Sequence, residues 1–220
     1  LGFQIDLTGA EVEQPVHKIG IGFCFAPIFH SSMKHAAVAR KELGVPTVFN
    51  ILGPLANPAK PIACAIGVAR AELLPLMAQV LLDQGKEGFV FRGDDGLDEV
   101  SLSTTTQVIQ SSNGELTQSV FNPEDLGIAS APITALAGGD AAYNAQMTMK
   151  IFSGEKGAMR DAVTLNAAFA IAAFKADFNL PLQTQIANGL VLANKAIDSG
   201  AALSIVNKWA QLTNEIVSAR

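Results

Sequence analysis

The sequence predicts an α/β fold with a mostly parallel central sheet, an added antiparallel hairpin and helices that cover the sheet. Short apolar runs at 61–69 and 88–92 flank a helical stretch at 71–83, which is the strand, helix, strand pattern of a parallel crossover unit. Asn113-Gly114 separates two alternating runs, as in a hairpin. Helical spacing then fills almost all of the chain after residue 140.

Composition limits the functions that this sequence can have. Of the 220 residues, 49% are hydrophobic and 16% charged, which excludes disorder and favours one globular domain over residues 1–220. The net charge is −5 and no apolar run reaches the ~18 residues of a membrane span, so neither nucleic acid nor a membrane is expected as a partner. Cys24 and Cys64 are too few for a disulfide framework and favour a reducing compartment. We expect a soluble, cytoplasmic protein.

The N-terminal zone is expected to be helical, with one irregular stretch. Thr8 and Glu11 have the spacing of a capping box that starts a helix over 10–18. A second helix is expected over 31–43. Three prolines and a glycine within 46–60 argue against a continuous helix there and predict an extended segment that enters a loop.

The C-terminal part of the chain is expected to be almost wholly helical. Asp140 is placed as the cap of the first helix there, a position that suits its side chain. Helices are expected over 140–152, 157–175, 180–199 and 202–219. No repeat, low-complexity tract or Ser/Gly linker marks a second complete domain.

An acidic cluster, GDDGLDEVSL, follows the expected strand at 88–92. Its four carboxylates lie within six residues and belong to Asp94, Asp95, Asp98 and Glu99. Crowded carboxylates raise one another's pKa values unless a cation is present, and ligands of open parallel sheets bind beyond the carboxyl ends of the strands. The cluster favours a Mg²⁺ site shared with a phosphorylated ligand, because Mg²⁺ commonly uses one or two carboxylates together with phosphates. An acidic, solvated turn is the alternative.

A second group of candidate residues starts just before the helix expected over 31–43 and continues along it. His30, Met33, Ala37 and Arg40 recur at three- and four-residue spacing and so share one face. A guanidinium and an imidazole over small residues could bind a carboxylate, with the arginine supplying a forked pair of hydrogen bonds. A basic exposed face is the alternative.

The glycines of the GGD stretch, Gly138–Asp140, form a third candidate. They precede a capped helix whose N-terminus could bind an anion, although two glycines before a helix are frequent in ordinary turns. The sequence contains no Walker loop, dinucleotide fingerprint, GxSxG elbow or recognisable catalytic triad. Nucleophilic hydrolysis is therefore not supported.

Taken in order, four segments resemble the anthranilate phosphoribosyltransferase family: GIGFCFAPIFHSSMKHAAVARKELGVPTVFNILGPLANPA, GDDGLDEVSL, GGDAAYNAQ and GAMRDAVTLNAA. The resemblance implies the C-terminal α/β domain type of nucleoside phosphorylases and these transferases. It also implies transfer of a phosphoribosyl group from phosphoribosyl pyrophosphate to the amine of anthranilate, with release of pyrophosphate, in tryptophan biosynthesis. Mg²⁺ as cofactor and a homodimer are implied as well.

The resemblance also assigns roles residue by residue. Arg40 matches the arginine that binds anthranilate, and His30 and Pro54 match positions that line the same pocket. Asp98 and Glu99 match the acidic pair that holds the metal. No side chain is assigned as a general base, because the aromatic amine is already neutral near pH 7. We expect Arg40 to face the acidic pair across one cleft.

Two segments of the family do not occur in this sequence, the Gly-Thr-Gly-Gly-Asp phosphate loop and the Lys-His-Gly-Asn segment. In the family both come before the point that matches Leu1. The resemblance therefore implies the larger C-terminal part of the enzyme, with residues 27–50 packed on a helical domain outside the chain and the dimer contact largely in that domain. We expect the 220 residues alone to be inactive.

Two other functions stay open. A pyrimidine-nucleoside phosphorylase shares the fold and the glycosyl-transfer chemistry by resemblance, although the GLDE pair and the NILGPLANP block favour the transferase. A non-catalytic fragment that binds a partner chain is the other, because half of the family's phosphate site is missing from the sequence.

Overall fold

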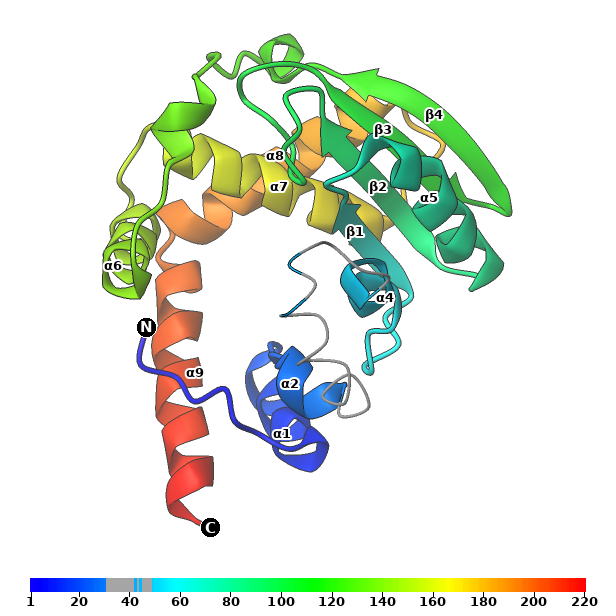
Figure 1. The fold of residues 1–220 in the computed structure, drawn as a ribbon. Helices are drawn as coiled ribbons and strands as arrows, with labels where there is room; N and C mark the ends of the chain where they lie inside the picture. The colour runs from blue at the N-terminus through cyan, green and yellow to red at the C-terminus, as the bar shows by residue number, and fades with distance from the viewer. Residues whose placement is uncertain (31–41, 43, 45–48) are drawn as a thin grey trace. The chain divides into compact units, whose positions relative to one another are not determined.

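The structure is a computed structural model that describes residues 1–30, 42, 44 and 49–220 (Figure 1). It divides into two compact units. The helical unit consists of Leu1–Lys60 and Ala201–Arg220, and the sheet unit consists of Pro61–Gly200.

The sheet unit is built on four strands in the order β1-β2-β3-β4. The strands are β1 (Ala63–Gly67), β2 (Glu87–Gly93), β3 (Thr106–Ser112) and β4 (Glu115–Phe121). β1 and β2 are parallel, with Ala65 opposite Phe89, and a crossover joins them through the 3-10 turn Ala71–Leu73 and helix α5 (Leu74–Asp83). The other two pairs are antiparallel, so the α/β class is confirmed, but the sheet in the described residues is mixed rather than mostly parallel.

The turn between β3 and β4 confirms the expected hairpin. Asn113 and Gly114 both have positive φ, 53° and 80°. Positive φ at both central residues is what a type I′ turn requires, and Asn-Gly is the sequence that adopts it most readily.

Helices cover both faces of the sheet, with α5 on one face and α7 and α8 on the other (Figure 1). The helices after the hairpin are α6 (Ala141–Phe152), α7 (Ala158–Lys175) and α8 (Leu182–Asp198). Alternation along β2 gives both faces a core: Phe89 and Phe91 pack with α7, and Val90 between them faces the α5 side. Phe169 of α7 is fully buried, and its ring centroid lies 5.2–5.5 Å from those of Phe89, Phe91 and Phe121.

A buried arginine ties the start of α7 to the end of α8. The Arg160 guanidinium donates to the Asn194 Oδ1 atom at 2.9 Å and lies 2.7 Å from the Asp198 carboxylate. Lys156 Nζ lies 3.2 Å from the same Asp198 oxygen. Hydrogen bonds to its carboxylate lower the pKa of Asp198, with the larger effect from Arg160 and the smaller from Lys156. The charged carboxylate therefore stabilises the folded state.

Acid should remove this stabilisation. The contribution of Asp198 is complete above the ordinary aspartate pKa of about 3.9, and it is lost as the pH falls toward the lowered pKa of the folded state, because the unfolded chain takes up the proton first. We predict that Asp198→Asn lowers the denaturation midpoint in urea at neutral pH and that the difference from wild type shrinks below about pH 4. Asp125→Asn, at another exposed aspartate, is the control. A difference that stays constant over this pH range would contradict the assignment.

The helical unit contains the first and last helices of the chain. Its described helices are α1 (Gly9–Ile19), α2 (Ala26–Phe29), α4 (Phe49–Leu55) and α9 (Ala201–Ser218). α1 packs against α9, and Phe3 stacks on Trp209 with ring centroids 4.1 Å apart. The capping box of Thr8 and Glu11 is confirmed. Hydrogen bonds from Arg220 and then from Thr8 lower the pKa of Glu11 to about 2, so the ion pair with Arg220 also joins the two ends of the sequence.

The stretch 46–60 corrects one prediction. Instead of an extended segment, residues Phe49–Leu55 form α4, with Pro54 inside it. A seven-residue helix makes few hydrogen bonds of its own, and the missing N–H of Pro54 is tolerated because Ala56 N still donates to Leu52 O at 2.9 Å. The helix expected over 31–43 lies almost wholly outside the described residues. The packing of 27–50 on another domain stays a prediction.

The expected C-terminal helices are confirmed, each within two residues of its expected ends. Asp140 caps α6 by accepting from Tyr143 N at 2.8 Å. In the described ranges, no single helix has both the length and the apolar composition needed to cross a membrane. Cys24 and Cys64 are free and half-buried, and burial raises the pKa of each thiol, which makes both poor nucleophiles.

Candidate functional site

The acidic cluster forms a loop that lies where the two parallel strands end. β2 runs directly into it, and β1 ends against it at Gly67. A Cβ placed on Gly67 would lie 1.7 Å from the carbonyl oxygen of Asp98. Only a residue without a side chain permits this approach. The loop therefore sits at the sheet edge where ligands of parallel strands bind.

Asp95 holds the loop in shape. Its carboxylate accepts hydrogen bonds from Ser101 Oγ at 2.6 Å, Ser103 Oγ at 2.5 Å and Leu97 N at 3.1 Å. Burial opposes ionisation of Asp95, but the hydrogen bonds together lower its pKa, so the group stays charged. The carboxylate is thus committed to the loop itself.

Asp94 and a helix residue fix the rest of the loop. Asp94 accepts from Thr105 Oγ1 and, at 3.0 Å, from Gln107 Nε2. On the other side, the Asn166 amide of α7 accepts from Val100 N at 2.9 Å and donates to Val100 O at 3.3 Å. The backbone just after Glu99 is therefore anchored to the core.

All four carboxylates of the loop are exposed, but among the described residues no group donates a hydrogen bond to those of Asp98 and Glu99, unlike those of Asp94 and Asp95. In the part of the chain that the structure describes, neither makes an ion pair. Two effects raise the pKa of Glu99. The larger is the loss of hydration where neighbouring protein atoms partly cover its carboxyl group, and the smaller is repulsion by the adjacent Asp98 carboxylate. A cation bound at this pair would stabilise the charged form of Glu99 beside the Asp98 carboxylate.

The kind of cation follows from the number of donors. Within the described residues, no group of three or more His, Cys, Asp and Glu side chains gathers to enclose a metal. A pair of carboxylates fits a Mg²⁺ ion that keeps several waters and shares phosphate oxygens of a ligand. Asp98 and Glu99 are therefore the residues suited to hold Mg²⁺.

The residues expected to bind a carboxylate ligand belong to the helical unit. His30 follows α2 as its C-cap and is half-buried, while Pro54 is exposed on α4. Arg40, Met33 and Ala37 lie outside the described residues. That Arg40 faces Asp98 and Glu99 across one cleft stays a prediction.

The GGD stretch is occupied by the chain's own groups. Asp140 accepts from the backbone of α6, and the side chain of Asn144 accepts from Gly139 N at 2.9 Å and donates to Gly139 O at 3.0 Å. These bonds use donors that an anion would need at this helix end.

Residues 1–203 match the sequence model of a known family, which is described as "Glycosyl transferase family, a/b domain". The chain belongs to this family. Within it, the sequence is similar to anthranilate phosphoribosyltransferases: it is 46% identical over 220 residues to that of Rhodococcus jostii (strain RHA1) and 44% identical over 214 residues to that of Streptomyces griseus. These matches cover 100% and 97% of this chain but 61% and 60% of the two relatives, so the chain spans about three-fifths of their length.

Solved structures of family members share the fold. The anthranilate phosphoribosyltransferase of Thermus thermophilus superposes with a TM-score of 0.85 at 35% identity, over 97% of this chain and 62% of that one. The Saccharomyces cerevisiae enzyme in complex with PRPP and Mg gives 0.85 at 27% identity, over 95% and 59%. Its complex with 4-fluoroanthranilate gives 0.87 at 27% identity, over 97% and 61%. The resemblance and the fold class predicted from the sequence are confirmed.

Two residues that shape the site were missed in the sequence. Gly67 lies within an apolar run, where a glycine can signal the close approach of another backbone. Asn166 lies in an Ala-rich helix, where a polar side chain facing the core needs a partner. Both signals were present, but neither tells which segment of the chain is the partner.

Proposed function

We propose that this chain is the metal-binding part of an anthranilate phosphoribosyltransferase. The reaction transfers the phosphoribosyl group of phosphoribosyl pyrophosphate to the amine of anthranilate and releases pyrophosphate, a step of tryptophan biosynthesis. The observation that carries the proposal is the exposed pair Asp98 and Glu99 on a loop fixed at the ends of two parallel strands. The names of the relatives at 46% identity, and the complex of one relative with PRPP and Mg, support it.

In this reaction a bond forms between the amine nitrogen and the anomeric carbon of the ribose. The bond from that carbon to a pyrophosphate oxygen breaks, its electron pair leaves with pyrophosphate, and the amine proton passes to solvent. Asp98 and Glu99 would hold Mg²⁺, which when bound neutralises charge on the departing pyrophosphate. The loop contacts of Asp95 and Asn166 keep the two carboxylates in place before the substrate binds.

We assign the binding site for anthranilate, the substrate that accepts the ribose, to the helical unit. Arg40 orients anthranilate through two parallel hydrogen bonds to its carboxylate, and His30 and Pro54 line the same pocket. We assign the phosphate loop and most of a homodimer contact to a segment that corresponds to the part of the relatives that these 220 residues do not match. We also propose that the enzyme works in the cytoplasm, and that the 220 residues alone are inactive.

The activity is tested by following anthranilate fluorescence with the upstream segment of the protein supplied. We expect anthranilate to be consumed only when phosphoribosyl pyrophosphate and Mg²⁺ are both present. Asp98→Asn combined with Glu99→Gln should lower turnover about 100-fold at fixed Mg²⁺, with Asp125→Asn as the control. Phosphorolysis of thymidine instead would favour the nucleoside phosphorylase. No turnover in either assay would favour a binding fragment.

The role of Arg40 has its own measurement in the same assay. Arg40→Ala should raise the KM for anthranilate about tenfold or more and leave the KM for phosphoribosyl pyrophosphate unchanged. Arg70→Ala, at an exposed arginine of the sheet unit, is the matched control. An unchanged KM for anthranilate would show that Arg40 does not bind this substrate.

A further inference from the structure

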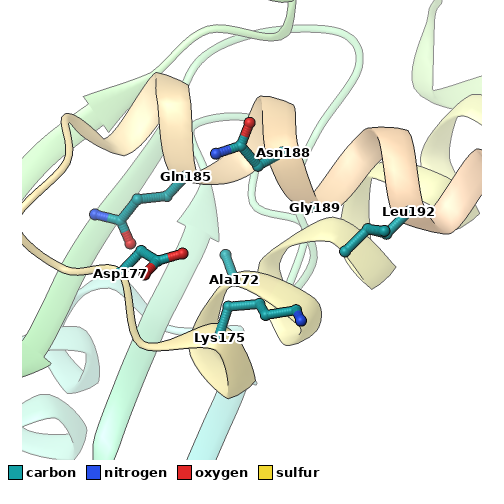
Figure 2. A pocket seen from close by; sticks show the side chains of 7 residues that line it. All are labelled: Ala172, Lys175, Asp177, Gln185, Asn188, Gly189 and Leu192. Carbon is teal, nitrogen blue, oxygen red and sulfur yellow. The ribbon is translucent and has the colours of Figure 1, made fainter.

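The sheet unit has a cavity between the C-terminal end of α7 and the first turns of α8 (Figure 2). Its volume is about 190 Å³. Pockets for drug-sized ligands are roughly 300–1,000 Å³, so this one suits a molecule of few heavy atoms. Lys175, which lines the cavity, is nine positions along α7 from Asn166, which corresponds to about 14 Å of helix. The cavity is therefore distinct from the acidic loop.

Backbone geometry builds this cavity. A Cβ on Gly189 would lie 2.4 Å from the carbonyl oxygen of Ala168, so α7 and α8 approach closely at that point. Ala176 ends α7 in the left-handed conformation, with φ of 56°, and turns the chain between Lys175 and Asp177. The two charged residues thus line the cavity from either side of one tight turn.

Gln185 supplies a buried acceptor beside this cavity. Its side chain is only 4% exposed, and its Nε2 atom donates to Leu180 O at 2.8 Å and to Gln110 Oε1 at 3.1 Å. Both partners are acceptors, so the orientation of the amide is fixed. Among the described residues nothing donates to Gln185 Oε1. Figure 2 shows this oxygen turned toward Asp177.

Two exposed side chains of opposite charge, Lys175 and Asp177, also line the cavity. Over the described ranges, Lys175 and Asp177 form no ion pair, either with each other or with another residue. A carboxylate next to an unpartnered amide oxygen calls for a positively charged N–H donor, and the lysine calls for an anion. Asn188 adds an amide, and Ala172 and Leu192 add an apolar wall. A small zwitterion satisfies all of these groups together.

We propose that this cavity binds a small α-amino acid. Its ammonium group donates to the Asp177 carboxylate and to Gln185 Oε1, and its carboxylate pairs with Lys175 Nζ. A short apolar side chain contacts Ala172 and Leu192. The proposal goes beyond the proposed function and does not depend on it.

The test is a titration of the ¹⁵N-labelled 220-residue chain with L-alanine, followed by NMR. The side-chain amide signals of Gln185 and Asn188 are assigned by their loss in Gln185→Met and Asn188→Ala. We expect both signals to shift in a saturable way, with a Kd on the order of 1 mM or tighter. Propionate and ethylamine, which each carry one of the two charges, should bind about tenfold more weakly or worse.

Charge removal then separates this site from nonspecific binding. Lys175→Met and Asp177→Asn should each weaken L-alanine binding about tenfold or more, while Lys195→Met, at an exposed lysine of α8 outside the cavity, should not. Both test positions are exposed, so the variants are expected to fold, and circular dichroism checks this. The proposal is wrong if the Gln185 signal does not shift, if the half-charged probes bind as well as L-alanine, or if Lys175→Met and Lys195→Met behave alike.

Discussion

Replacing Gly67 by alanine is expected to remove most of the Mg²⁺-dependent turnover and to destabilise the sheet unit. The new Cβ would lie 1.7 Å from the carbonyl oxygen and 2.6 Å from the carbonyl carbon of Asp98. These are backbone atoms, so the loop itself has to move. A shift of about 1 Å in a group that positions substrate can cost about 100-fold in rate, and overpacking typically costs about 1–3 kcal/mol.

Two glycine variants make this result interpretable. Gly88→Ala places a Cβ 1.9 Å from Cys64 O, at the opposite end of the same two strands, so it should lower stability without lowering turnover of the folded protein. Gly9→Ala places a Cβ no nearer than 3.8 Å to Phe29 and should change neither. Thermal unfolding and initial rates measure the two effects. Normal turnover in Gly67→Ala would contradict the placement of Asp98 against β1.

Phe169→Ala is expected to have the largest effect on stability, about 3–5 kcal/mol. The ring is fully buried and lies at the centre of three other phenylalanine rings, so its removal leaves a cavity and also loses the aromatic contacts. Phe174→Ala is the matched control, because that ring is on the same helix but 76% exposed. It should change stability by no more than about 0.5 kcal/mol.

Urea denaturation of both variants measures the difference. If Phe169→Ala cost less than about 1 kcal/mol, the packing of α7 on the sheet would be wrong. If Phe174→Ala cost as much as Phe169→Ala, the exposure of the outer face of α7 would be wrong.

Most elements were predictable because their signals are local. The Asn113-Gly114 turn fixes its own backbone geometry, and Asp140 satisfies the helix that it precedes. The prediction of an extended segment in 46–60 was wrong for a related reason. Proline rules describe the hydrogen bond that is lost at Pro54, but not how few such bonds a seven-residue helix requires.

The candidate site was predictable as a set of residues but not as an arrangement. Four clustered carboxylates indicated a ligand site, and the resemblance assigned Asp98 and Glu99 to the metal, but the spacing of the residues alone did not show that Asp94 and Asp95 hold the loop. That role depends on partners such as Gln107, which lies on β3. The amino-acid cavity was not foreseen either, because it arises where α7 and α8 meet.

The helical unit is assembled from both ends of the sequence, with α1 against α9 and Phe3 against Trp209. The sheet unit can therefore fold without residues 201–220, whereas the N-terminal helices lack a packing partner until α9 has been synthesised. A nonsense mutation near residue 200 would consequently act on residues 1–60, which would lack α9 and would aggregate or be degraded by proteases.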